Sequence, residues 1–133
     1  MAPHFGFPRT SRLLHGWQFD LVFRTGRRVQ GELVRLLFLD APDGTTRIGM
    51  AVGKKQGKSF RRNRGRRLLR EGVRRVVPWL RPGLWFVLTL RSAGLEAGGV
   101  EVYEDLARLL RARGFLSEDF PGVDWTPWEE KGP

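Results

Sequence analysis

The feature that most constrains this chain is a dense arginine segment at residues 57–75. The stretch GKSFRRNRGRRLLREGVRR holds eight arginines, one lysine and a single acid, Glu71. An apolar stripe recurs there at spacings of three and four, and Pro78 bounds its end, which predicts a helix over about residues 60–77. The stripe consists of Leu69, Val73, Val76, Val77 and Leu80. A flank about 120° away carries Asn63, Arg66, Arg67, Arg70 and Arg74. One side of the helix must therefore pack on a core while another presents guanidinium groups.

Gly65 and Gly72 lie inside this predicted helix. Each is expected to cost about 1 kcal/mol relative to alanine. Tertiary packing or a bound RNA must then help to hold the helix together.

The whole net charge of the chain lies in the same region. Residues 54–75 hold 11 basic side chains and 1 acid, and the remaining residues hold 13 of each. A field of one sign that is so concentrated attracts a polyanion, with an affinity that falls steeply with salt. Nucleic acid is favoured over an anionic membrane, which needs a broad Trp, Phe and Leu face opposite the charges. It is also favoured over a solvated surface helix, which normally mixes both signs at i,i+4 spacing.

Other composition features narrow the class further. At 133 residues without cysteine, the chain is expected to form one domain with no disulfide, no CxxC zinc site and no thiol catalysis. No apolar run approaches the roughly 20 residues of a membrane span, and the N-terminus lacks the order of a signal peptide. We therefore expect a cytoplasmic protein that does not bind membranes.

The periodicity predicts an α/β arrangement with one small sheet. Helices are expected at about residues 11–25, with Thr10 or Ser11 as N-cap, and at about 100–114. Strands are expected at 32–40, 47–55 and 84–91, the first two forming a β-hairpin or neighbouring antiparallel strands across the APDGTT turn. The glycine-rich residues 92–99 are expected to be a loop, and the acidic residues after Gly114 a tail that is loose or docks through Trp125 and Trp128.

The predicted helix at 11–25 is apolar on two sides. Leu14, Trp17, Gln18 and Leu21 fall on one side, and Arg12, Phe19 and Phe23 fall on the other. Burial on both sides is the simpler interpretation and is favoured by the residues alone. The alternative is that Phe19 and Phe23 line an open groove where an unpaired base stacks.

No catalytic site is predicted in the chain itself. A metal-free ribonuclease needs two converging histidines or a similar acid–base pair, and the chain has only His4 and His15. A two-metal nuclease needs clustered carboxylates, whereas the acids here fall in a turn, at a helix start and in the tail.

The central residues resemble the bacterial ribonuclease P protein subunit. RIGMAVGKK is followed after two residues by GKSFRRNRGRRLLRE, which is similar to the Arg-Asn-Arg motif helix of that family, and SRLLHGWQFDLVFRTGRRV resembles its first helix. The resemblance covers about residues 9–113. It implies an α+β sandwich of three helices on a four-stranded sheet, like the second domain of ribosomal protein S5, with a left-handed βαβ crossover. It also implies three parts of the chain: an N-terminal extension at residues 1–10, an RNA-binding domain at 11–114, and an acidic, Trp-containing tail at 115–133.

The resemblance also implies a function and its residues. Such a protein binds the catalytic RNA of ribonuclease P and the 5′ leader of precursor tRNA, and it promotes a Mg²⁺-dependent cleavage that matures tRNA 5′ ends. The RNA performs the chemistry and holds the Mg²⁺ together with the substrate, and no obligate protein partner is implied. Contacts with the catalytic RNA are expected from Lys54, Lys55, Arg62, Asn63, Arg64, Arg66, Arg67 and Arg70. Leader contacts are expected from Arg12, Phe19 and Phe23, which reverses the preference for simple burial of the two phenylalanines.

The sequence departs from the family pattern in three places. Gly65 stands where an apolar residue is usual, Gly53 precedes the lysines where serine is common, and the tail has no counterpart. The alternative to the ribonuclease P assignment is a general structured-RNA-binding protein, such as a ribosomal protein, with no role in tRNA cleavage.

Overall fold

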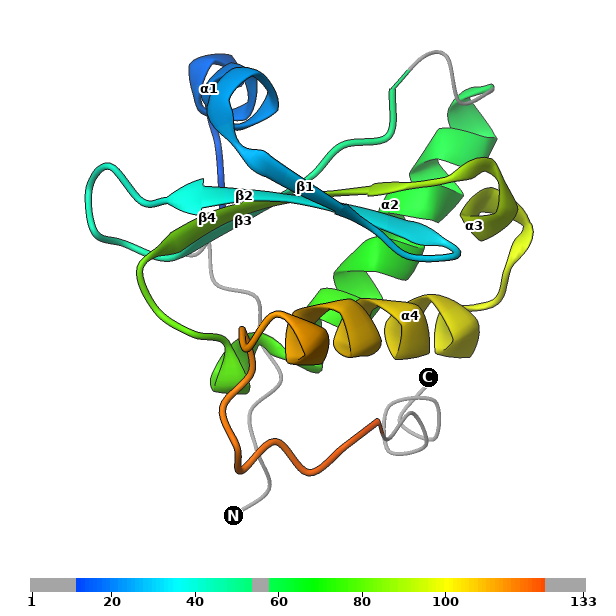
Figure 1. Cartoon of the computed structure of the whole chain (residues 1–133). Helices are drawn as coiled ribbons and strands as arrows, with labels where there is room; N and C mark the ends of the chain where they lie inside the picture. Colours follow the sequence, from blue (N-terminus) through cyan, green and yellow to red (C-terminus); the bar gives the residue numbers. More distant parts are fainter. Residues whose placement is uncertain (1–11, 54–57, 124–133) are drawn as a thin grey trace.

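A four-stranded sheet with helices on both faces forms the body of the protein (Figure 1). The computed structural model describes residues 12–53 and 58–123. The elements follow in the order α1 (Gly16–Thr25), β1 (Arg27–Gln30), β2 (Val34–Asp40), β3 (Arg47–Met50), α2 (Ser59–Arg74), η3 (Val77–Trp79), β4 (Leu84–Leu90), α3 (Ser92–Glu96) and α4 (Gly99–Ala112). The predicted α+β class is confirmed, with three longer helices and the five-residue α3.

The strand order is β1-β2-β4-β3. β2 pairs antiparallel with both β1 and β4, and β3 pairs parallel with β4, so that β3, α2 and β4 form a βαβ crossover. The prediction that β2 and β3 are neighbours was wrong, because β4 lies between them. β4 is buried along its whole length, as a central strand must be, and it is the most apolar strand of the sheet. The fourth strand, which the sequence did not locate, is β1 at one edge.

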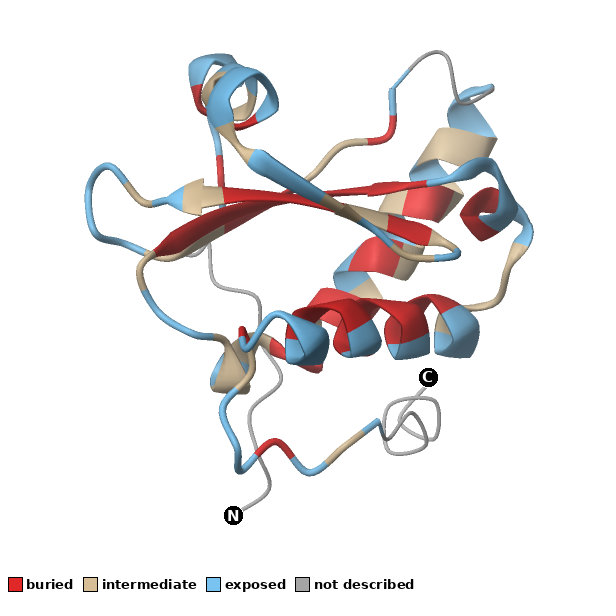
Figure 2. Ribbon diagram, in the orientation of Figure 1, coloured by how far each residue is buried: buried red, intermediate tan, exposed pale blue. Residues whose placement is uncertain are grey.

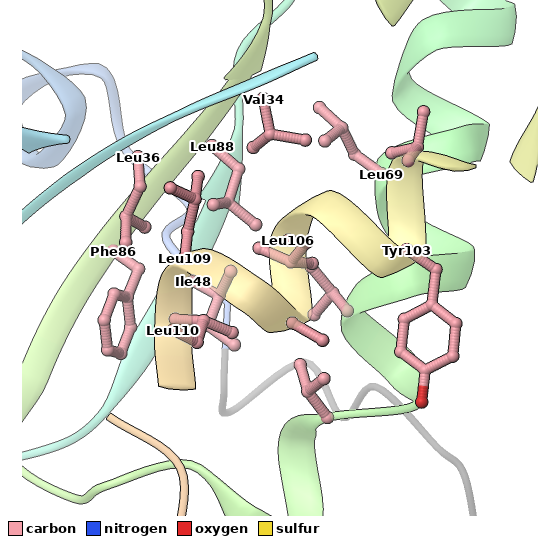
Figure 3. Packing of buried hydrophobic residues seen from close by; sticks show 14 of the residues in the cluster. Val34, Leu36, Ile48, Leu69, Phe86, Leu88, Tyr103, Leu106, Leu109 and Leu110 are labelled. Carbon is pink, nitrogen blue, oxygen red and sulfur yellow. The ribbon is translucent and has the colours of Figure 1, made fainter. Parts of the chain in front are cut away.

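Side-chain alternation divides the core between the two faces of the sheet. On one face, Val22 of α1 packs with Leu37 of β2 and with Trp85 and Val87 of β4. On the other face, the alternate β2 and β4 side chains, among them Leu36 and Leu88, meet α2 and α4 (Figure 3). Because the central strands β2 and β4 are covered on both faces, their residues are mostly buried (Figure 2). The sheet thus holds α1 and α2 on opposite sides.

The apolar stripe of α2 seats it against α4 and the sheet. Leu69 and Val73 are buried, and the helix ends at Arg74, earlier than predicted, before the short η3 turn that contains Pro78. Gly65 lies close to the sheet, because a Cβ there would be 3.2 Å from Leu90 Cδ1. This close approach accounts for a glycine inside the helix, and tertiary packing supplies the support that the sequence required.

Helix α1 begins at Gly16 rather than at residue 11, and His15 is its N-cap. The buried Gln18 side chain secures this start, since its Oε1 accepts from the backbone N–H of Leu14 (2.7 Å) and of His15 (2.9 Å). Before the helix the chain is extended, and the Leu13 N–H donates to the Ile48 carbonyl at 3.0 Å. The described part of the chain thus enters the domain along β3.

A buried carboxylate ties α4 to the β1–β2 turn. Asp105 is 3% exposed, and its Oδ2 accepts from the backbone N–H groups of Leu33 and Val34, both at 2.8 Å. Its Oδ1 accepts from the Glu32 N–H at 3.3 Å. The segment after α4 continues the core through Phe115 and Phe120, whereas Trp125 and Trp128 lie outside the described residues.

Candidate nucleic-acid interface

Helix α2 presents a polar face that no other element covers. Asn63, Arg67 and Arg70 are exposed, and Arg62 and Arg66 are partly buried. Arg66 is held in place, since its Nη1 donates to the Val52 carbonyl (3.3 Å) and its Nη2 donates to Asn63 Oδ1. Arg67 and Arg70 have no hydrogen bond or ion pair with any residue in the described ranges. They are therefore available to an external anion.

Arg64, the second arginine of the Arg-Asn-Arg motif, points to the other side of α2. Its Nη1 donates to the Leu95 carbonyl and its Nη2 to the Ala97 carbonyl, both at 2.8 Å. These carbonyls lie at the C-terminal end of α3, where backbone acceptors lack helical partners. The structure thus brings together Arg62, Asn63, Arg66, Arg67 and Arg70 on one face and places the Arg64 guanidinium on α3. The predicted contacts of Lys54 and Lys55 fall outside the described residues.

Phe19 of α1 lies directly on β3. A Cβ added at Gly49 would be 2.5 Å from both Cε1 and Cζ of the Phe19 ring, so only glycine leaves room for the ring at this position. Arg12 forms a parallel bridge with the adjacent Ile48, which brings Arg12 and Phe19 to the same edge of the sheet. Phe23, one turn further along α1, is 37% exposed. Phe19 is therefore partly engaged with the sheet, and Phe23 presents its ring to solvent.

Beyond α1 the same face of the sheet becomes polar. Arg28 pairs with Leu37 and Gln30 pairs with Arg35 across β1 and β2, and Thr89 of β4 lies opposite Arg35. The Nε atom of Arg35 is buried without a hydrogen-bond partner in the described structure. Arg28 and Arg35 therefore lie on the same face of the sheet as α1, and neither is among the residues that the sequence predicted for leader binding. The available signal was Arg35 itself, a charge inside the otherwise apolar run LVRLLFL.

Comparison with known proteins identifies the family. A family model described as Ribonuclease P matches residues 7–113. The chain belongs to the ribonuclease P protein family. The ribonuclease P protein component of Symbiobacterium thermophilum is 35% identical over 109 residues, covering 81% of this chain and 95% of that protein. The component of Xanthomonas euvesicatoria is 36% identical over 111 residues, covering 83% and 75%.

Solved structures agree with this membership. The ribonuclease P protein from Thermotoga maritima superposes with a TM-score of 0.67 at 31% identity, covering 76% of this chain and 96% of that one. The Staphylococcus aureus ribonuclease P protein gives a TM-score of 0.71 at 16% identity, covering 82% and 100%, a likeness of fold. The described chain therefore shares its overall fold with these ribonuclease P proteins.

Acidic side chains of this ribonuclease P family member serve structural roles. The Asp43 carboxylate accepts from the Thr45 N–H (3.0 Å), from Arg47 Nε (3.2 Å) and from Trp85 Nε1 (3.2 Å). These donors, the Thr45 N–H foremost, hold the pKa of Asp43 below its ordinary value of 3.8 against the opposing effect of desolvation. Within residues 12–53 and 58–123, no group of three or more His, Cys, Asp or Glu side chains is arranged to hold a metal ion. No helix in these ranges is long and apolar enough to span a membrane.

Proposed function

We propose that the protein binds the RNA subunit of ribonuclease P through the outward face of α2 and the 5′ leader of precursor tRNA through the α1 face of the sheet. In this way it promotes the endonucleolytic cleavage that produces mature tRNA 5′ ends. The observation that carries the proposal is the α2 face. Two of its guanidinium groups, those of Arg67 and Arg70, lack partners within the described protein, on a chain whose family is the ribonuclease P protein component.

The chemistry of α2 suits an RNA backbone. A guanidinium fork donates two parallel hydrogen bonds to a phosphate, and Arg67 and Arg70 are free to do so. The bond from Arg66 to the Val52 carbonyl fixes the direction of a third guanidinium at the end of β3. Preorganised donors lose less side-chain entropy on binding, which favours a lasting contact.

The chemistry of the α1 face suits a single strand. Phe23 offers an exposed ring, and Phe19 lies beside it over β3. Stacking on such rings contributes about 1–3 kcal/mol per base and tolerates any sequence, as a leader of variable sequence requires. Arg28 and Arg35 add positive charge on the same face of the sheet for the leader phosphates.

We propose that the RNA subunit and the substrate hold the catalytic Mg²⁺. Three of the described carboxylates fit this assignment, because Asp43, Glu71 and Asp105 are each engaged by donors of the protein itself. Hydrated Mg²⁺ bound by RNA phosphates would supply the activated water, while this chain binds and orients the two RNAs.

Reconstitution tests the proposal. The protein is mixed with a bacterial ribonuclease P RNA and a 5′-labelled precursor tRNA at low Mg²⁺, beside RNA alone and protein alone. Cleavage at the mature 5′ end that requires both components supports the proposal. Tight RNA binding without any stimulation of cleavage would instead identify a general structured-RNA-binding protein.

Two pairs of substitutions separate the two surfaces. Arg67→Ala with Arg70→Ala should reduce the salt slope of RNA-subunit binding by about 2, since about two phosphate contacts are lost. Arg24→Ala with Arg111→Ala removes the same charge elsewhere and should leave the slope unchanged. Phe19→Ala with Phe23→Ala should weaken binding of precursor tRNA but not of mature tRNA. Equal losses for both tRNAs would disprove the leader assignment.

A further inference from the structure

Three arginines from separate elements surround a hollow at the β1 edge of the sheet. Arg27 begins β1, Arg81 follows η3, and Arg113 caps the end of α4. The hollow has a volume of about 560 Å³, within the range of about 300–1,000 Å³ that is typical of small-ligand pockets. Phe38 and Phe115 also line it, with ring centroids 4.8 Å apart in an edge-to-face contact. The site thus combines a cationic rim with an aromatic wall.

Among the described residues, the side chains of the rim arginines form no ion pair or hydrogen bond that would occupy their donors. All three side chains are exposed. The Arg113 guanidinium lies over the Phe38 ring, with its central carbon 5.3 Å from the ring centroid. Asp40 is the one acid among the lining residues, which leaves an excess of positive charge. Outside residues 54–75 the chain holds equal numbers of acids and bases, so this local excess stands out from its surroundings.

The hollow is separate from both surfaces of the proposed function. Arg27 pairs with Phe38, and Phe38, Leu84 and Phe115 belong to the core on the α2 and α4 face, whereas Leu39 and Thr25, at the end of α1, line the hollow from the other side. Phe19 and Phe23 of α1 lie on the opposite face. The outward arginines of α2 lie near the end of β3, to which Arg66 is bonded through Val52, whereas β1 and β3 form opposite edges of the sheet.

We propose that this hollow binds one unpaired nucleotide of the ribonuclease P RNA subunit. The phosphate lies between the three guanidinium groups, and the base stacks on the Arg113 guanidinium, which Phe38 supports from behind. Unpaired bases are commonly held by stacking on guanidinium planes and aromatic rings. A hollow of this size admits a single nucleotide and excludes a duplex. The RNA subunit is favoured over the leader because Phe19 and Phe23, the rings proposed to stack on the leader, do not line the hollow.

The proposal rests on the RNA partner of the proposed function, and the experiment separates the two. The chain has no cysteine, so Ala112→Cys places one reactive thiol at the rim of the hollow. A photoactivatable aryl azide on this thiol is irradiated in the complex with the RNA subunit alone. Glu104→Cys, on the exposed side of α4, is the control position. Binding of the RNA subunit by the wild-type protein tests the proposed function. The cross-linking pattern of the labelled variants tests the nucleotide site.

The decisive comparison adds Arg27→Gln, Arg81→Gln and Arg113→Gln together. We expect the cross-link from position 112 to fall at least fivefold, whereas the background cross-linking from position 104 should not change. The salt slope should fall by about 1 rather than 3, because three guanidinium groups converge on one phosphate. The triple Arg→Lys variant keeps the charge but not the planar stacking surface, and it should recover the salt slope but only part of the cross-link. If the triple Gln variant does not fold, as judged by its thermal unfolding, single Arg27→Gln and Arg81→Gln variants replace it.

Four results would overturn the assignment. The first is a cross-link from position 112 that the triple Gln variant leaves unchanged, and the second is no cross-link despite tight RNA binding. The third is an effect that appears only when precursor tRNA is present, which would place the substrate in the hollow. The fourth is equal competition by polyglutamate and by a short single-stranded RNA of the same charge, which would indicate a general anion site.

Discussion

The Asp105 anchor is predicted to be a major source of stability for the domain. The Oδ2 atom of Asp105 accepts two short hydrogen bonds from backbone N–H groups of the β1–β2 turn. One of these donors is the N–H of the fully buried Val34. Hydrogen bonds to a charged partner contribute about 1.5–3 kcal/mol each, and donors left without a partner in a buried site add a similar penalty. We therefore expect Asp105→Ala to lower the free energy of unfolding by about 3–5 kcal/mol, a large share of the 5–15 kcal/mol typical of a domain.

Urea denaturation and calorimetry measure this effect. A loss of that size corresponds to a drop in Tm of about 10–20 °C for a chain of this length. Glu104→Ala, the exposed neighbour on α4, should change stability by less than about 0.5 kcal/mol. Gly31→Ala should act on the same bonds, since a Cβ at Gly31 would meet both carboxylate oxygens of Asp105.

The double variant of Gly31 and Asp105 can refute this account of the Asp105 anchor. If both substitutions break one set of bonds, Gly31→Ala combined with Asp105→Ala should cost clearly less than the sum of the two single effects. Additive losses, or an Asp105→Ala cost below about 1 kcal/mol, would show that water replaces the carboxylate at the turn and that the anchor is weak.

Three further predictions follow from contacts described above. Gly49→Val should displace the Phe19 ring and weaken precursor tRNA binding about tenfold by the loss of one stacking contact, with RNA-subunit affinity unchanged in a filter-binding assay. Because the pKa of Asp43 is lowered in the folded state, its contribution to stability is complete above 3.8 and is lost as pH falls through the lowered value, so Asp43→Asn should flatten the acid limb of a stability–pH curve. Arg64→Ala should cost about 1.5–3 kcal/mol of stability in urea denaturation, through its two bonds to α3, yet change the salt slope of RNA binding less than Arg67→Ala does.

The sequence predicted the long elements because their side chains repeat with the period of the structure they form. Leu69 and Val73 mark the buried stripe of α2, and the strand that begins at Leu84 is apolar throughout because both of its faces are covered. β1 escaped prediction because it is an edge strand: its residues RRVQ are mostly exposed and show no apolar alternation. The five-residue α3 was hidden by the glycines of residues 92–99, of which Gly94, inside α3, approaches the Leu33 carbonyl.

The order of the strands could not be read from local patterns. The turn between β2 and β3 looks like a hairpin, yet β4 enters between them from more than 40 residues after β2 begins. Only the burial of all seven β4 side chains decides this order, and burial is a property of the assembled sheet.

The sequence predicted only part of the candidate site, because helical spacing is a local pattern whereas contacts between distant segments depend on the assembled fold. Helical spacing placed Arg67 and Arg70 on the outward face, where the structure has them. The same spacing could not show that the Arg64 guanidinium reaches the carbonyls of α3, because a contact across 31 positions of the chain depends on tertiary structure. No local sequence pattern indicates the rim of Arg27, Arg81 and Arg113, because these three residues come from distant segments of the chain.

The insertion of β4 between β2 and β3 has a consequence for the growing polypeptide on the ribosome. β1 and β2 can pair as soon as they emerge, but β3 has no ladder partner among the strands until β4 is made, and Leu84 follows Met50 by 34 positions. At a synthesis rate of about 5–20 residues per second, that interval lasts about 2–7 s. The arginine-rich α2 is translated within it, before the sheet against which it packs is complete. Nascent chains of this protein therefore expose a cationic, unseated segment beside ribosomal RNA for seconds, and α2 is packed fully only after β4 and then α4 have been made.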